Sequence, residues 1–194
     1  MKAFLLLLLL FSTVSAFAQS RAAQTADTIR LPIDPATQLI TYSVVEQQPG
    51  ASQAELYARA KFWLTSVQPS LLTEEKESSV VQGTCSKTIV VSTLGNLVPQ
   101  MLLYTVKIAA KDGRYRYEVS NFRFTSITPA RPNDSVVPLP AEIYTSTVQK
   151  KGAMFKIAQS AQVALRDAYP AIATSLKAGM AKPATGTSAG KTDW

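Results

Sequence analysis

The sequence has no histidine and only one cysteine, Cys85, among its 194 residues. Without histidine the chain cannot build a Ser–His–Asp or Cys–His catalytic group, and it cannot bind a metal ion through imidazole. A single cysteine excludes an internal disulfide and a zinc site made of several thiolates. Hydrophobic residues make up 46% of the chain and charged residues 17%, which is typical of a globular domain. This length predicts one domain with a buried core of its own.

The first eighteen residues have the pattern of a secretory signal peptide. Lys2 provides a positive start, residues 3–11 form an unbroken apolar run, and Ala16 and Ala18 are the small residues of a cleavage site. The run is shorter than the roughly 20 residues that a membrane-spanning helix needs, which makes a membrane anchor the less favoured alternative. We therefore expect residues 1–18 to be removed on export. The mature protein is then periplasmic or secreted and has no membrane span.

Composition divides the mature chain into three parts. Residues 19–30 are polar and rich in Ala and Thr, which predicts a flexible lead-in. Residues 181–194 lack hydrophobic periodicity, which predicts a disordered tail. A single domain is expected between them, over residues 31–180. Loss of Lys2 leaves 19 basic residues against 13 acidic ones, a net charge of +6.

Hydrophobic periodicity predicts five strands and two helices. Ser52 and Glu55 form a capping box at the start of the first helix, and Trp63 on its apolar face is an expected core residue. Gly83 in mid-strand indicates a bulge or close packing against a helix. The predicted elements are a strand at 39–46, a helix at 53–67, strands at 71–74, 80–91, 102–110 and 115–124, and a long helix from Ala153.

The C-terminal third is predicted to contain a loop and the long helix. Residues 128–140 include four prolines, which predicts a long surface loop. Pro170 should kink the helix or split it at Tyr169, and Gly179 is its expected C-cap. The apolar stripe of this helix consists of Ala161, Leu165, Ala168, Ile172 and Leu176.

The Asp-Gly pair at 112–113 predicts a two-residue hairpin turn between the last two strands. This turn places Lys107 opposite Glu118, an opposite-charge pair on one face of the hairpin. The apolar residues then change parity, which predicts a one-residue bulge near residues 120–121. The apolar pairs predicted on the other face are Ala110 with Tyr115, Ile108 with Tyr117, Val106 with Val119, Tyr104 with Phe122, and Leu102 with Phe124.

Each predicted strand has one apolar and one polar face. The economical packing is an α+β fold, with a five-stranded antiparallel sheet and both helices on one face, in the order β-α-β-β-β-β-α. Neither an internal repeat nor a Gly-rich phosphate loop is present in the sequence.

Three separated stretches of the sequence carry a family resemblance. They are Leu31-Pro32 with Asp34 and Ile40-Thr41-Tyr42, Pro49–Ser52 with Glu55–Tyr57 and Ala60–Trp63, and Lys111–Tyr117 with Asn121-Phe122. In this order they resemble a bacterial exported domain family of unknown function with a TATA-box-binding-protein-like (TBP-like) fold. The resemblance covers roughly residues 31–127 and implies the same element order and export. It implies no catalytic or ligand residue, and a shared fold transfers no DNA binding.

Two candidate chemical sites have simpler interpretations. Cys85 lies on a predicted inward face without a histidine partner, so a buried and inert thiol is favoured over a reactive one. Glu74, Glu75 and Glu77 gather with Lys76 at a predicted turn, where a solvated surface is favoured over a cation site or an acid–base pair. No cofactor or metal ion is expected.

Basic and aromatic residues alternate along the predicted hairpin, a pattern that also occurs in nucleic-acid-binding strands. Alternation turns the tyrosines towards the core and the arginines towards solvent, so they do not form one stacking platform. We therefore expect no nucleic acid partner. Asn133-Asp134-Ser135 resembles a short glycosylation signal, a weak motif in a bacterial protein. The alternating residues are Lys107, Arg114, Tyr115, Arg116, Tyr117 and Arg123.

The sheet face opposite the helices is the expected interaction surface, at Leu103, Lys107, Arg116 and Glu118. The favoured function is a non-enzymatic exported domain that binds an envelope protein or a small ligand. The alternatives are a structural or stress-related envelope protein and a hydrolase of envelope polymers that uses paired carboxylates. The isolated carboxylates are scattered over different elements, at Asp34, Glu46, Asp112, Glu118 and Asp167.

Overall fold

The structure is a computed structural model that describes residues 29–127, 137–145 and 152–181. All of its helices and strands belong to one unit that begins at Leu31. Several sequence predictions lie outside the described residues: the signal peptide at 1–18, residues 19–28 of the lead-in, residues 128–136 of the Pro-rich loop with the motif at Asn133, and residues 182–194 of the tail.

The elements follow the predicted order, with one short strand added. The helices are α1 (Gln53–Ser66) and α2 (Ala153–Ala181), and a 3-10 helix η1 (Ala141–Tyr144) precedes α2. The added strand β6 (Leu139–Pro140) lies in the stretch that was predicted to be a loop, because two residues are too few to show alternation. The other strands are β1 (Tyr42–Gln47), β2 (Leu71–Glu75), β3 (Val80–Thr93), β4 (Asn96–Lys111) and β5 (Arg114–Ser126).

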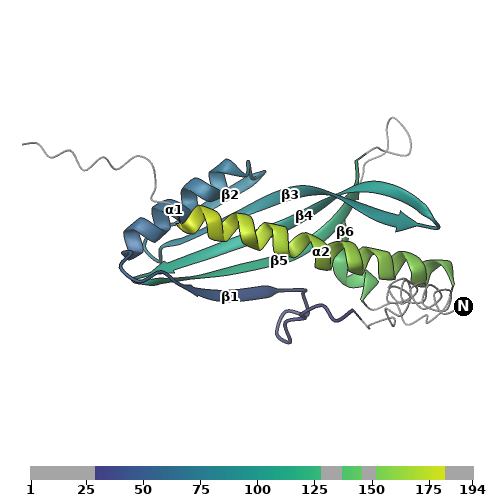
Figure 1. Cartoon of the computed structure of the whole chain (residues 1–194), viewed down its shortest axis with the longest axis horizontal. Coiled ribbons are helices and arrows are strands. Elements are labelled where there is room, and N and C mark those ends of the chain that lie inside the picture. The colour runs from purple at the N-terminus through teal and green to yellow at the C-terminus, as the bar shows by residue number, and fades with distance from the viewer. Residues whose placement is uncertain (1–28, 128–136, 146–151, 182–194) are drawn as a thin grey trace, which may run out of the picture. The chain divides into compact units, whose positions relative to one another are not determined.

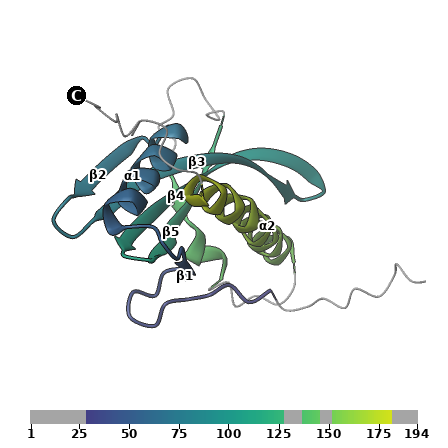
Figure 2. The ribbon, with the colours of Figure 1, turned by 60° about the vertical axis from the view of Figure 1, so that its left-hand side comes forward.

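The strands form one antiparallel sheet in the order β1-β5-β4-β3-β2, and β6 also pairs with β5. Both helices lie on the same face of this sheet (Figures 1 and 2). Helix α1 packs on β3, β4 and β5, and α2 packs on β3 and on α1. The predicted α+β fold with both helices on one face is confirmed.

The hairpin between β4 and β5 has the predicted register, with Lys107 opposite Glu118 and Ile108 opposite Tyr117. The register shifts by one residue between Leu103 and Thr105, which confirms the bulge. Asn121 is the inserted residue, since its φ of 53° lies in the left-handed region. Beyond the shift, Leu102 pairs with Phe124 as predicted. Tyr104 lies at the bulge itself, and its ring stacks on Phe122 with 6.3 Å between centroids.

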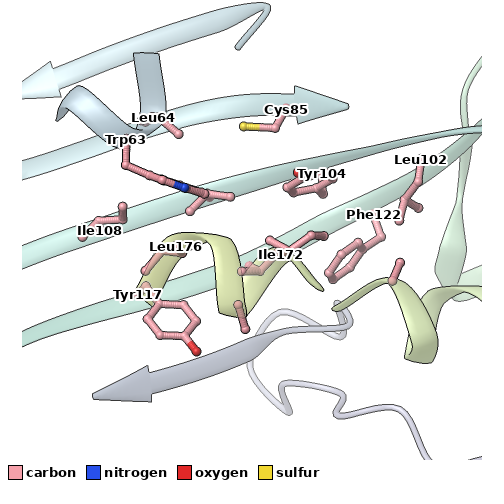
Figure 3. Close-up of a cluster of buried hydrophobic side chains, with 14 of the residues drawn as sticks. Trp63, Leu64, Cys85, Leu102, Tyr104, Ile108, Tyr117, Phe122, Ile172 and Leu176 are labelled. Atoms are coloured by element: carbon pink, nitrogen blue, oxygen red, sulfur yellow. The ribbon is translucent and has the colours of Figure 1, made fainter. Parts of the chain in front are cut away.

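The core lies between the sheet and the two helices (Figure 3). Trp63 is buried on α1 as predicted, and its indole Nε1 donates a hydrogen bond to Ser175 Oγ of α2 at 3.2 Å. The whole predicted stripe of α2 is buried. From the strands, the largest fully buried side chains include Leu102, Ile108, Tyr115, Tyr117 and Phe122.

Glycine has a packing role at two positions. A Cβ on Gly83 would lie 3.1 Å from Leu64 of α1, which confirms the predicted close packing there. The C-cap prediction for Gly179 is wrong, because α2 continues past it to Ala181. A Cβ on Gly179 would lie 2.8 Å from Trp63 Cγ, so its small size allows α1 and α2 to approach each other. Helix α2 also continues through Pro170 as one helix and is not split there.

Candidate functional site

The sheet face that is turned away from α1 and α2 is called the open face here. Its residues alternate with the buried residues along each strand, so the strand pattern alone places them. Leu103, Lys107, Arg116 and Glu118 all lie on it, as predicted from the hairpin register. The open face comprises Ser43, Val45 and Gln47 of β1, Leu71, Thr73 and Glu75 of β2, Val80, Gln82, Thr84, Ser86, Thr88 and Val90 of β3, Met101, Leu103, Thr105, Lys107, Ala109 and Lys111 of β4, and Arg114, Arg116, Glu118, Ser120, Arg123 and Thr125 of β5.

Charged side chains meet at the middle of the open face. The Arg116 guanidinium pairs with Glu118 Oε1 at 2.7 Å, and Lys107 lies directly opposite Glu118 on β4. The Arg116 side chain is 56% exposed and that of Glu118 is 28% exposed. One carboxylate therefore stands between two cations, which leaves excess positive charge at the surface. This arrangement attracts anionic groups rather than cations.

Asn121 adds a polar link that periodicity did not identify. The bulge turns its side chain onto the open face, where Nδ2 donates to Thr105 Oγ1 at 3.4 Å. Arg123 Nε in turn donates to Asn121 Oδ1 at 3.2 Å. The change of parity predicted the bulge, but it contained no signal for the direction of this side chain.

Hydroxyl-bearing and apolar residues share the rest of the open face, and none of the residues that define it is aromatic. Tyr115 and Tyr117 are buried on the opposite side of the sheet, each 1% exposed. The open face therefore offers hydrogen-bonding groups and cations but no ring on which a base could stack. The hydroxyl-bearing residues are Ser43, Thr73, Thr84, Ser86, Thr88, Thr105, Ser120 and Thr125.

A shallow depression of about 380 Å³ borders the open face beside the loop at residues 33–41. Asp34 and Glu118 both line it, so two of the five scattered carboxylates share one surface. Asp34 already accepts hydrogen bonds from Ala36 N at 2.9 Å and Thr37 Oγ1 at 3.1 Å, and Glu118 is paired with Arg116. Both carboxylates therefore have structural partners. This geometry does not favour a hydrolase.

The other three carboxylates also have local partners, on separate elements. Glu46 pairs with Lys177 at 2.6 Å, and Asp112 Oδ1 accepts from Gln53 N at 2.7 Å. Asp167 pairs with its neighbour Arg166 at 2.8 Å. Within the described residues, no group of three or more His, Cys, Asp or Glu side chains is arranged to hold a metal ion.

Cys85 and Glu74 occupy ordinary structural environments. Cys85 is 2% exposed, and burial raises the pKa of its thiol to about 11, so little thiolate forms near neutral pH. Glu74 lies in β2, as the strand predicted at 71–74 requires, and β2 continues to Glu75, which was assigned to the turn. Glu74 accepts hydrogen bonds from Lys61 Nζ at 3.0 Å and Tyr57 OH at 2.9 Å. Both bonds lower the pKa of Glu74, and the bond from Lys61 has the larger effect.

None of the described helices is both long enough and apolar enough to cross a membrane.

No curated protein matches the chain. The structure is similar to a crystal structure of a DUF4468 family protein from Bacteroides ovatus, with a TM-score of 0.57, 18% identity, and coverage of 80% of this chain and 92% of that one. A TBP-like protein from Parabacteroides distasonis has a TM-score of 0.48 and 12% identity, with coverage of 72% and 93%.

The family comparison matches the part of the chain that contains the sheet. Residues 42–125 match the model of a family described as a domain of unknown function (DUF4468) with TBP-like fold. This stretch runs from β1 through α1 and the next three strands into β5. The resemblance identified from the sequence is confirmed, because residues 42–125 match the model of this family with a TBP-like fold.

Proposed function

We propose that this protein is an exported interaction domain of the bacterial cell envelope, which binds its partner through the open face. The main support is a surface across five strands that neither helix covers. At its middle, Lys107 and Arg116 lie on either side of the Glu118 carboxylate. The N-terminal pattern of residues 1–18 supports export.

The charge of the open face favours an anionic partner. Lys107, Lys111, Arg114, Arg116 and Arg123 provide five cations on this face, against the two carboxylates Glu75 and Glu118. Hydroxyl groups around them can donate to phosphate, sulfate or carboxylate oxygens. An acidic segment of an envelope protein or a small anionic ligand fits this chemistry.

The test is a charge-neutralising pair on the open face, Lys107→Ser with Arg116→Ser. Proteins that bind the open face are cross-linked to the wild type and to this variant in intact cells. We expect the amount of cross-linked partner to be at least about tenfold lower for the variant, because electrostatic contacts contribute to encounter and specificity. The readout is quantitative mass spectrometry of the cross-linked proteins. Unfolding in urea should change little, because both side chains are at the surface.

The matched control is Lys61→Ser with Lys76→Ser, which removes the same charge away from the open face. It should keep the wild-type set of partners, since the Lys61–Glu74 ion pair is at the surface and contributes little to stability. Equal recovery of partners by the open-face pair and by the wild type would contradict the proposal.

Export has a separate test. Mass spectrometry of the mature protein from periplasmic and culture fractions should find Gln19 at its N-terminus, because the cleavage signal ends at Ala18. A protein that retains Met1 in the membrane fraction would contradict export with cleavage.

A further inference from the structure

The outer edge of β3 is only partly covered. Strand β4 pairs with β3 along its full length from Val80 to Thr93, whereas β2 pairs only with Val80–Thr84. At one end of the remaining edge, Ser70 N donates to Thr84 O at 2.8 Å. At the other end, Ser92 N donates to Ser160 Oγ of α2 at 2.7 Å. A stretch of strand edge is left between these two points.

The backbone groups of this stretch follow from the strand geometry. In an antiparallel strand, every second residue directs both its N–H and its C=O to the same edge. The Thr84 carbonyl and the Ser92 N–H both form their hydrogen bonds at this edge. The alternate residues between them, Ser86, Thr88 and Val90, therefore direct their backbone N–H and C=O groups to the same edge. Among the described residues, no group pairs with the edge at these three positions. Three outward donors and three acceptors are thus available to an added strand.

A groove runs between this edge and α2. It has a volume of about 410 Å³ and is called the edge groove here, defined by Lys87, Ile89, Val90, Val163, Ala164 and Asp167. A second depression of about 570 Å³ adjoins it at Ser92 and extends to Lys156 near the start of α2. Apolar residues from both elements line the edge groove, among them Ile89 of β3 with Val163 and Ala164 of α2. An apolar side chain from an added strand would be shielded there from water.

The charges along the two depressions are unbalanced. Asp167 is already paired with Arg166 at 2.8 Å. Lys87 and Lys156 line the two depressions, and neither has a carboxylate partner within the described ranges. An occupant that brings carboxylates to both ends would compensate these ammonium groups.

We propose that the β3 edge and α2 form a docking site for an extended peptide segment of a partner protein, with alternating apolar side chains and acidic ends. The segment adds to the sheet as a strand in line with β2 and hydrogen-bonds to Ser86, Thr88 and Val90. Its apolar side chains enter the edge groove, and its acidic ends lie near Lys87 and Lys156. Backbone pairing provides affinity, and the groove selects the side chains, as in other cases of strand addition.

A second copy of this chain fits the same edge less well. Its β3 would direct Lys87 and Ile89 towards the groove. Ile89 is already buried in the core of its own copy, at 8% exposed. Lys87 would bring a further cation to a site that already has unpaired cations. A separate acidic peptide has neither disadvantage.

The probe is a fluorescent synthetic peptide, Glu-Val-Thr-Leu-Thr-Val-Glu, titrated against the full mature chain and measured by anisotropy. A second peptide with Lys at both ends is the charge control. We expect saturable binding of the acidic peptide, with a Kd at least about tenfold lower than that of the basic peptide. Hydrogen exchange should show fast amides at Ser86, Thr88 and Val90 that the acidic peptide slows. Absence of saturable binding to the wild type would overturn the proposal.

Thr88→Pro tests the backbone pairing, because it removes an outward N–H that β4 does not use. Thr88→Val is the matched control, since it keeps the N–H and the shape of the side chain. We expect at least about a tenfold weaker Kd for the Pro variant and wild-type binding for the Val variant. Equal binding by both variants would overturn the proposal. If Thr88→Pro fails to fold, Lys87→Glu serves instead, and it should reduce the preference for the acidic peptide.

Two further measurements separate the alternatives. Sedimentation velocity of the free protein should show a monomer, and a dimer that dissociates in the Thr88→Pro variant would overturn the proposal in favour of a second copy. The open-face variant Lys107→Ser with Arg116→Ser should bind the peptide like the wild type. Loss of binding in that variant would place the peptide on the open face and contradict the edge groove. The two proposals can therefore fail independently.

Discussion

At the scale of single residues, the contact between the two helices depends on a residue without a side chain. Gly179 of α2 lies against the indole of Trp63, and Trp63 Nε1 donates to Ser175 Oγ one turn earlier on the same helix. Arg59 of α1 also donates to Met180 O at 2.8 Å, which satisfies a carbonyl at the end of α2. The sequence pattern identified Gly179 as a helix end because glycine is common there. The pattern contains no information about the neighbouring helix.

Replacing Gly179 with alanine should destabilise the protein by about 1–2 kcal/mol. The added methyl group overpacks the contact with Trp63, at a cost of about 1–3 kcal/mol, and the better helix propensity of alanine offsets up to about 1 kcal/mol. Urea unfolding measures the change. In a Trp63→Leu background the same substitution should be neutral or stabilising, because the space is then open. Equal destabilisation in both backgrounds would show that the indole does not limit the approach.

At the scale of elements, the hairpin of β4 and β5 was predicted almost pair by pair. The Asp-Gly turn at 112–113 fixes the start of the register, and alternation carries it along both strands. The same reasoning identified the bulge, since Phe122 and Phe124 must face the core. Strand β6 and the uncovered edge of β3 were not predicted. Both depend on which distant segments lie beside a strand, and a local pattern does not contain that information.

Asn121 tests the bulge directly. Its φ of 53° is unfavourable for most side chains, and it bonds to Thr105 and Arg123. Asn121→Ala should therefore destabilise the protein by about 1–2 kcal/mol, and Asn121→Gly by less because glycine adopts this φ freely. Urea unfolding compares the two, with Ser120→Ala as a control on the same face. If the alanine variant were as stable as the glycine variant, the left-handed backbone at this position would be in doubt.

Deleting Asn121 is the more severe change at the same position. Without the inserted residue, Phe122 and Phe124 would shift to the open face, and Arg123 would face the core. The deletion variant should lose cooperative unfolding or the near-ultraviolet circular dichroism of the packed aromatic residues. Full retention of both would mean that the register can re-form without the bulge.

At the scale of the whole molecule, buried tyrosines connect the sheet to its helical layer. Burial raises the pKa of Tyr104 and of Tyr115 to about 12. Burial also raises the pKa of Tyr117, and the hydrogen bond with Tyr169 of α2 adds to the shift. These phenols are therefore favoured in their protonated form by the fold. The stability of the whole domain should depend on pH in the alkaline range.

We expect the free energy of unfolding to decrease as the pH rises from about 10 to about 12. In the unfolded chain a tyrosine ionises near its ordinary pKa of 10.0, whereas Tyr104 and Tyr115 keep their protons in the fold up to about pH 12. The unfolded state then binds fewer protons than the native state, so stability decreases with pH in this window and is fully present below it. The buried thiol of Cys85 also lowers the free energy of unfolding as the pH rises from its ordinary pKa of 9.0 to its folded-state pKa of about 11. Urea unfolding at a series of pH values measures the slope, and Tyr104→Phe should reduce it. A midpoint that does not change between pH 10 and 12 would show that these phenols ionise equally in both states.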